Sequence, residues 1–216
     1  EEVKALTEKW FGSIPAGIKP ERNLPKEPQQ AEDRRLEIKA DVPSNRIYVA
    51  FPVVGRYDQG YHAIDLMSDL LGRNESSFLY IELVQNQRIF DSLHASLTGS
   101  VDPGLLVVSG QVCDGVDVAD AEKALLDAIE RFVQNGIDAE GLQRVKNQAE
   151  ASLVFGEVEV LNRAMNLAMA ANAGNVEFVN SEAEHIASVE LLEVQDWANK
   201  LFVQGKKNTL LYLKQG

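Results

Sequence analysis

Three histidines, His62, His94 and His185, are the residues of this chain whose type is most suited to binding a metal ion. A catalytic zinc site needs three converging protein ligands and an open position, often with two His one helical turn apart. No two of these histidines have helical spacing. Residues 181–185, Ser-Glu-Ala-Glu-His, would match an inverted His-x-x-Glu-His motif only if the first were His, and a hydroxyl is a poor zinc ligand. The residues therefore predict no metal site. We expect His62 on a helix surface and His94 on a sheet face that contacts a partner.

Covalent and phosphate-binding chemistry have no recognisable pattern either. Gly-x-Ser-x-Gly, which would present a serine nucleophile, does not occur, and no feature marks Cys113 as an activated thiolate. The glycines are spaced as turn and strand residues, not as a Gly-x-Gly-x-x-Gly cradle for phosphate. Paired carboxylates such as Glu157 and Glu159 carry little information in a chain with 33 acidic residues. The residues alone predict a domain without a self-contained active site.

The composition argues against several classes of partner. A net charge of −12 disfavours nucleic acid, whose phosphates need a basic patch, and also anionic membrane surfaces. No apolar run approaches the ~18 residues that cross a bilayer, and no signal peptide is visible. The chain begins with Glu1 rather than Met, which leaves room for an upstream segment. We expect a soluble protein whose acidic residues cover solvated helix faces.

Residues 76–96 are the stretch around which the other elements are arranged. They predict a short helix followed by an alternating strand. In that strand Leu93 and Ala95 share one face, and Ser92 and His94 share the other. A period of two is typical of a half-buried strand.

The remaining segments predict further strands and helices. Strands followed by helices, with one antiparallel hairpin, indicate an α+β fold in which an antiparallel-rich mixed sheet has helices packed on one face. We expect a helix at 2–11, a strand at 36–40, and a strand at 46–51 that is closed by Pro52 and buried on both faces, which suggests a central position. We further expect a helix at 57–71 ended by Gly72, a hairpin strand at 105–112, and three helices between 118 and 172, the second of them capped by Asp138. A helix capped by Ser188 and a last strand at 209–213 complete the predicted elements.

The order and spacing of these segments resemble the second, non-catalytic domain of the pitrilysin/insulinase family of zinc metallopeptidases. Residues 9–17, Lys-Trp-Phe-Gly-Ser-Ile-Pro-Ala-Gly, look like the exit from the family's first domain. Ser-Ser-x-Leu-Tyr from residue 76 looks like the entry to a helix of the second. The resemblance implies that residues 1–17 are the terminal helix of a preceding domain, 18–35 an interdomain linker and 36–216 a pitrilysin-like C-terminal domain.

In that family an active domain bears His-x-x-Glu-His on its first long helix, and a distal Glu completes the zinc site. A sister domain of the same fold lacks the metal. The long helix here begins the matching stretch with His62, but Asp65 stands where the catalytic Glu would be and Leu66 where the second His would be. The resemblance therefore implies a metal-free sister domain without a catalytic residue, whose partner half would hold zinc.

The resemblance also suggests where substrate would be contacted. Many sister domains carry an Arg after a helical Leu, and a Tyr seven residues later, and both contact the substrate. Val84 and Asp91 occupy these positions here, and Arg88 lies between them. Together with His94, these residues are the substrate-binding candidates.

The function implied by the resemblance is that of the metal-free C-terminal half of a zinc-dependent peptidase. This half would enclose and dock a peptide for cleavage by an N-terminal catalytic half, in the same protein or in a separate subunit, and would be inactive alone. The alternative is a catalytically inactive structural or peptide-binding subunit. An unrelated α+β enzyme is a third hypothesis. Homo-oligomerisation and the compartment, bacterial cytoplasm or periplasm, stay open.

Overall fold

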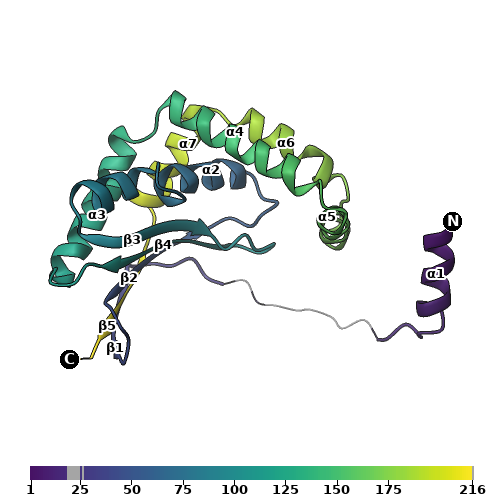
Figure 1. The fold of residues 1–216 in the computed structure, drawn as a ribbon, viewed down its shortest axis with the longest axis horizontal. Coiled ribbons are helices and arrows are strands. Elements are labelled where there is room, and N and C mark those ends of the chain that lie inside the picture. The colour runs from purple at the N-terminus through teal and green to yellow at the C-terminus, as the bar shows by residue number, and fades with distance from the viewer. Residues whose placement is uncertain (19–24, 26, 216) are drawn as a thin grey trace.

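A five-stranded mixed sheet forms the centre of the fold in the computed structural model, which describes residues 1–18, 25 and 27–215 (Figure 1). Its strands are β1 (Arg34–Ala40), β2 (Arg46–Val53), β3 (Phe90–Leu97), β4 (Gly104–Val112) and β5 (Asn208–Lys214). Their order is β1-β5-β2-β4-β3, and only the β1–β5 pair is parallel among these described strands. The predicted α+β fold with an antiparallel-rich mixed sheet is confirmed.

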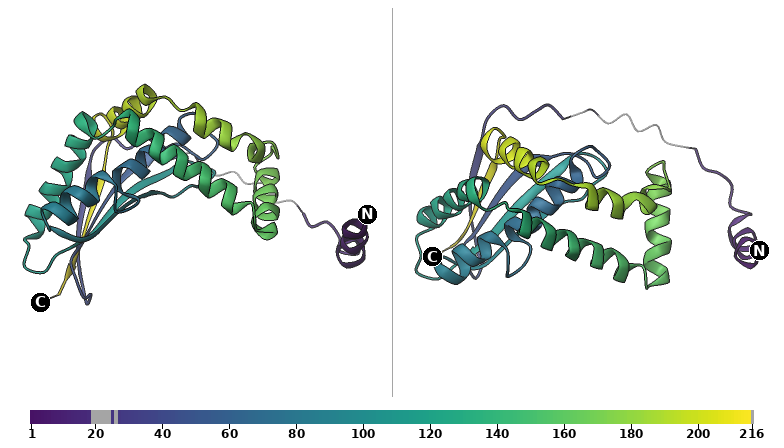
Figure 2. Two further views of the ribbon diagram at one scale, coloured as in Figure 1. Left: turned by 45° about the horizontal axis from the view of Figure 1, so that its top comes forward. Right: turned by 90° about the horizontal axis from the view of Figure 1, so that it is seen from above.

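Helices cover one face of this sheet and leave the other uncovered (Figures 1 and 2). The covering layer is built from α2 (Tyr61–Gly72), the π-helical turn η1 (Tyr80–Asn86), α3 (Val118–Asn135), α4 (Ala139–Gly156), α5 (Val160–Asn172), α6 (Phe178–Ser188), α7 (Leu191–Ala198) and the π-helical turn η2 (Asn199–Val203). A further helix, α1 (Glu2–Phe11), buries no residue and does not belong to this layer. α2 packs directly on β3, and α4 and α7 pack on the outer side of α2. The core therefore lies between the sheet and α2. None of the helices in the described part of the chain is both long enough and apolar enough to span a bilayer.

The central strand β2 has one buried face. Ile47, Val49 and Phe51 are buried, whereas the residues between them are half-buried or exposed. The prediction of burial on both faces was therefore wrong. The strand also continues through Pro52 to Val53, where it pairs with β4 alone. Its pairing with β5 ends at Ala50, so β2 is locally an edge strand at Pro52, and a proline is tolerated there.

Helix α2 begins four residues later than predicted. Gly60, in the left-handed region with φ 89°, precedes its first residue, Tyr61. Before it, the Asp58 carboxylate accepts a hydrogen bond from the amide of Gly55 at 2.9 Å. This local side-chain contact holds residues 55–60 in turns, because Asp competes with helix formation by bonding nearby backbone groups.

The C-terminal end of α2 lies very close to β3. Gly72 is the last residue of α2, and a Cβ placed on it would come within 2.7 Å of the Ala95 Cβ. Glycine is thus required here by close packing rather than by backbone conformation. The helix end predicted at Gly72 is confirmed, and the contact fixes α2 against the strand whose other face is uncovered.

Two helix N-termini were predicted from capping residues, and the structure confirms one of them. Asp138 accepts from the Gly141 amide at 2.6 Å and caps α4, as predicted. The prediction that Ser188 caps the following helix was wrong. Ser188 ends α6 and its hydroxyl donates to the His185 carbonyl at 2.9 Å, so α7 begins only at Leu191.

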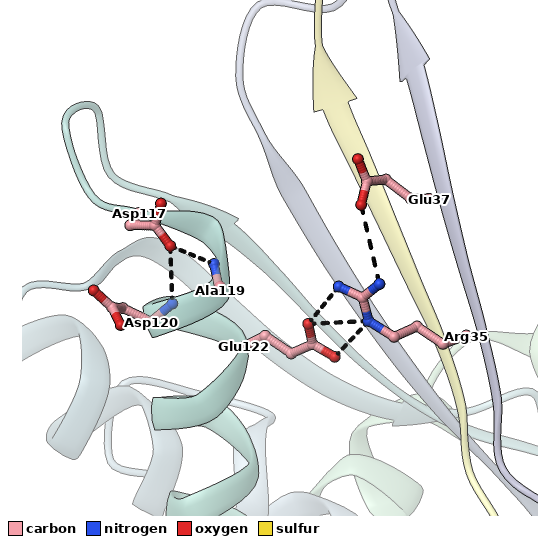
Figure 3. A network of polar contacts seen from close by, with 6 residues as sticks. All are labelled: Arg35, Glu37, Asp117, Ala119, Asp120 and Glu122. Carbon is pink, nitrogen blue, oxygen red and sulfur yellow. Dashed lines mark hydrogen bonds and ion pairs between the residues drawn. The ribbon is translucent and has the colours of Figure 1, made fainter.

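The edge strand β1 is linked to α3 by an ion pair (Figure 3). The Arg35 guanidinium donates to both carboxylate oxygens of Glu122, with the shortest distance 3.0 Å from Nη2 to Oε2. Glu37 lies 4.0 Å from the same guanidinium, and Asp117 caps α3 beside it. No residue of β1 is buried, so the strand has little apolar packing. These polar contacts therefore help to hold β1 in place.

Helix α1 spans the residues predicted and ends before Gly12. It buries no residue, although Leu6, Trp10 and Phe11 are apolar. Part of the predicted linker, residues 19–24 and 26, lies outside the described residues, and regular structure resumes with β1 at Arg34.

Candidate functional site

The face of the sheet opposite the helices, which we call the open sheet face, carries a polar surface near β3. The register places Ser92 beside Gln111 and His94 beside Ser109. These positions alternate with Leu93 and Ala95, which are buried against the helices. The alternation predicted for β3 is confirmed, and the polar side chains are accessible to a ligand on the open sheet face.

A string of hydrogen bonds crosses this face from β2 to β3. Arg46 Nη2 donates to Gln111 Oε1 at 3.1 Å, and Gln111 Nε2 donates to Asp91 Oδ2 at 3.4 Å. The Cys113 thiol donates to Asp91 Oδ1 at 3.2 Å. Burial, followed by the Asp91 carboxylate, raises the pKa of the Cys113 thiol. Cys113 is therefore a hydrogen-bond donor here rather than a thiolate nucleophile.

A β-bulge brings Asp91 to the open sheet face. Phe90 pairs with Val112 and Ser92 with Gln111, so Asp91 is an extra residue in β3. Counting by two from Leu93 would place Asp91 on the buried face. The bulge instead buries Phe90 and leaves the carboxylate exposed.

The four substrate-binding candidates lie at different places. Asp91 and His94 are both exposed on β3. Arg88 is exposed in the turn between η1 and β3, where its φ of 55° is in the left-handed region. Val84, in η1, is half-buried and packs against the core. The structure thus brings Asp91 and His94 to one strand and keeps Val84 apart from them.

The outer edge of β3 offers backbone groups for another strand. The Thr98 amide donates to the Leu105 carbonyl at 2.9 Å, so the amide at this position points toward β4. In an antiparallel ladder the amides of successive residues point alternately toward the paired strand and away from it. The amides of Leu93, Ala95 and Leu97 therefore point to the outer edge, where β3 is the last strand of the sheet.

A second polar cluster lies on the opposite side, between α2 and α6. The Glu182 carboxylate is 3.1 Å from Arg56 Nη2 and 3.9 Å from His62 Nε2. The rings of His62 and His185 lie 5.3 Å apart. The prediction that His62 is a surface residue was wrong, because the packing of α6 on α2 leaves only 19% of its side chain exposed. Burial lowers the pKa of His62, while the Glu182 carboxylate opposes this effect.

The residues of α2 do not fit a zinc ion. Leu66, where a second His would be needed, is 2% exposed within the hydrophobic core. The His62 ring faces Glu182, and no group of three or more His, Cys, Asp or Glu among the described residues has the arrangement of a metal site. Asp65 is half-buried, and this burial raises the pKa of its carboxyl group to about 6.

The family of this chain follows from a comparison with known domains. A family model described as the Peptidase M16 inactive domain matches residues 1–149. The chain belongs to this family. The pitrilysin/insulinase family that the sequence resembles is the M16 family, so the predicted non-catalytic domain is confirmed.

Solved structures share the fold of this M16 inactive domain. A protease from Helicobacter pylori, 19% identical, aligns with 98% of this chain at a TM-score of 0.89. The match covers 52% of that protein, so the chain spans about half its length. The inactive peptidase domain of a candidate zinc protease from Bordetella parapertussis is 17% identical, with 82% of this chain and 95% of that chain aligned and a TM-score of 0.74.

A periplasmic protease from Escherichia coli is also similar, at 11% identity and a TM-score of 0.77, with 99% of this chain and 24% of that one covered. No curated protein matches the chain in a sequence comparison.

Sequence reasoning missed Arg46, Gln111 and Cys113 at the open sheet face. These residues lie on strands separated in sequence, and only the register between β2, β4 and β3 brings them to Asp91. One signal was available, because a charged Asp91 at an inward position of an alternating strand is typical of a bulge. The α2–α6 cluster had no such signal, since its partners are 120 residues apart along the chain.

Proposed function

We propose that this M16 inactive domain is the metal-free half of a zinc-dependent peptidase. The observation that carries the proposal is an M16 inactive-domain fold whose α2 has buried Leu66 at the place of a zinc ligand. The other half, in the same protein or a separate subunit, would hold zinc and the general base. Zinc there would polarise the scissile carbonyl and activate a water molecule.

This half contributes by enclosing and docking the peptide. An extended peptide adds to the outer edge of β3, where the amides of Leu93 and Ala95 donate to its carbonyl groups. Asp91 and His94 contact its side chains from the open sheet face, and Arg88 contacts it from the turn before β3. Val84 supports the peptide indirectly, by fixing η1 against the core.

A second candidate function is that of a catalytically inactive structural or peptide-binding subunit. It is favoured by Val84 and Asp91, which stand where many sister domains carry an Arg and a Tyr that contact substrate. In both functions the chain itself performs no cleavage. One similar structure is a periplasmic protease, and we propose the periplasm or the cytoplasm of a bacterium as the compartment.

The test is cleavage of a labelled, unstructured peptide by the complete protein and by its Asp91→Asn/His94→Ala variant. Both residues are exposed, so the fold should be unaffected. We expect KM to rise about fivefold, which corresponds to about 1 kcal/mol of binding energy, with zinc content unchanged. Asp127→Asn, at an exposed position of α3, is the matched control. An unchanged KM in the double variant would show that the open sheet face does not bind the substrate.

A further inference from the structure

The open sheet face is apolar where β1, β5 and β2 pair with one another. The register places Leu36 beside Leu210 and Leu210 beside Tyr48, and in the next row it places Ile38 beside Tyr212. The residues that alternate with them on β2 and β5 are buried under the helices, so these five side chains point to the open sheet face. We call the five residues the β1–β5–β2 patch. Leu36 is 58% exposed and Ile38 40% exposed, and the other three are half-buried.

The β1–β5–β2 patch lies on the side of the sheet away from the covering layer of helices (Figures 1 and 2). In a soluble protein, large apolar side chains that lie together at the surface mark a contact site. The patch also continues into the polar surface of β3, since Tyr48 pairs with Ser109 and Ser109 pairs with His94. A ligand bound beside β3 can therefore extend across the patch.

Three exposed cations border the patch on the same face. Arg34 lies two residues before Leu36 on β1, Lys214 lies two residues after Tyr212 on β5, and Arg46 pairs with Tyr212 from β2. The structure describes every residue of these three strands, and none of those on this face is acidic. A chain with 33 acidic and 21 basic residues thus presents only positive side-chain charge here.

The cations on the two faces of β1 differ in their partners. On the helix side, Arg35 is paired with Glu122. The ion pairs formed within the described part of the chain include none of Arg34, Arg46 and Lys214. Arg46 donates instead to the neutral amide of a glutamine. Cations that lack a carboxylate partner beside an apolar patch complement a ligand that is both apolar and acidic.

Arg34 and Lys214 lie at the two ends of the patch. The seven residues of β1 separate them, because Arg34 begins this strand and Ala40, at its other end, pairs with Lys214. At about 3.3 Å per residue the separation is roughly 20 Å, which about six residues of an extended peptide would span.

We propose that the β1–β5–β2 patch binds an apolar segment of the peptide substrate that has an acidic residue at each end. This deepens the proposed function, on which it rests, by naming the substrate class. The apolar side chains of the segment contact Leu36, Ile38 and the two tyrosine rings. Its carboxylates pair with Arg34 and Lys214. Because such pairs are exposed to solvent, the preference they give is moderate and is screened by salt.

The experiment measures the binding of two fluorescein-labelled, unstructured peptides to the complete protein. Both contain the same run of Val, Leu and Phe, which one peptide flanks with Asp and the other with Lys. Binding is read from the initial fluorescence anisotropy, before any cleavage. We expect the Asp peptide to bind about tenfold more tightly at low ionic strength, and the two to bind about equally at 1 M salt.

Charge reversal tests the assignment of the two cations. Arg34→Glu/Lys214→Glu should reverse the preference, so that the Lys peptide binds more tightly; both side chains are exposed, and the fold should be unaffected. Lys39→Glu/Lys123→Glu is the matched control, because it changes the net charge equally at exposed positions on the other face of β1 and on α3. This control should keep the preference for the Asp peptide.

The apolar part of the patch is tested by Leu36→Asn/Ile38→Asn. We expect this variant to bind both peptides about fivefold more weakly and to keep the ratio of their affinities, because it removes apolar contact and no charge. Leu192→Asn, at an exposed position of α7, should leave both affinities unchanged.

The outcomes separate this inference from the proposed function. Equal affinity for the two peptides at low ionic strength, with cleavage present, would overturn the substrate class alone. A preference that Arg34→Glu/Lys214→Glu reverses, in a complete protein without zinc or cleavage, would support the patch and refute the peptidase. A preference that this variant leaves unchanged, or binding of neither peptide, would overturn the inference. It would also be overturned by a dimer that Leu36→Asn/Ile38→Asn dissociates, since a second copy would then cover the patch.

Discussion

Asp65 is a half-buried carboxyl group on the inner part of α2. Burial raises its pKa to about 6, neighbouring Asp69 adds to this, and Arg73 and Arg56 oppose it. The resemblance to the family places Asp65 where an active domain would carry its catalytic Glu, and the next residue, Leu66, is buried in the core. Its ionisation therefore costs stability without serving a metal.

The pH dependence of stability follows from this shift. Between pH 4 and 6 the folded protein keeps a proton on Asp65 that the unfolded chain releases, so the free energy of unfolding falls as pH rises through this window. Below about pH 4 the penalty is absent, and above about pH 6 it is complete. We expect Asp65→Asn to raise stability at pH 7.5 by about 1–2 kcal/mol, less than the full shift implies because solvent partly screens the site.

Urea unfolding at several pH values checks this prediction. The gain of Asp65→Asn over the unaltered protein should be large at pH 7.5 and vanish near pH 4. Asp127→Asn, at an exposed position, should show no such trend. A gain that is independent of pH would show that Asp65 is not the group responsible.

The contacts of a single residue could be predicted only where they are made with its neighbours in the sequence. Asp138 follows directly from its place before a helix, and it caps α4 as expected. The burial of His62 depends on α6, which is distant in the chain. The environment of Asp91 depends on the strand register and on a bulge. The polar string of the open sheet face could thus not be derived from the spacing of its residues.

At the scale of elements, the contact between α2 and β3 positions the candidate site. Gly72 allows the helix to approach Ala95, and the uncovered face of the same strand carries His94. The helices, the hairpin and the central strand were predictable from apolar periodicity and turn residues. The start of α2 could not be predicted in this way, because the helical apolar pattern extends back to residue 57. Asp58 and Gly60 nevertheless favour turns there.

We expect Gly72→Ala to destabilise the protein by about 1–3 kcal/mol, because a methyl group would overlap the Ala95 backbone and Cβ. Gly156→Ala is the matched control, since its Cβ would meet no atom within 4 Å at the end of α4. It should be neutral or stabilising by up to about 1 kcal/mol. Chemical denaturation of both variants checks the prediction, and equal stabilities would show that α2 and β3 are less closely packed than described.

At the scale of the whole molecule, helices α1 and α5 leave large apolar side chains exposed. Leu6 and Trp10 of α1 and Leu161 of α5 are far apart in the sequence, and each exposes between 47% and 68% of its surface. The family and the α+β fold could be predicted from the order of the elements. The exposure of most of α5 could not, because its apolar periodicity is the same as that of a helix in a core.

The central claim is that this chain is the metal-free half of a zinc peptidase. The most direct test is the zinc content of residues 1–216 and of the complete protein, measured by mass spectrometry after dialysis. We expect about one zinc ion per complete protein and none retained by residues 1–216, since a catalytic site needs three ligands that α2 does not supply. Stoichiometric zinc in residues 1–216, or its absence from the complete protein, would contradict the account.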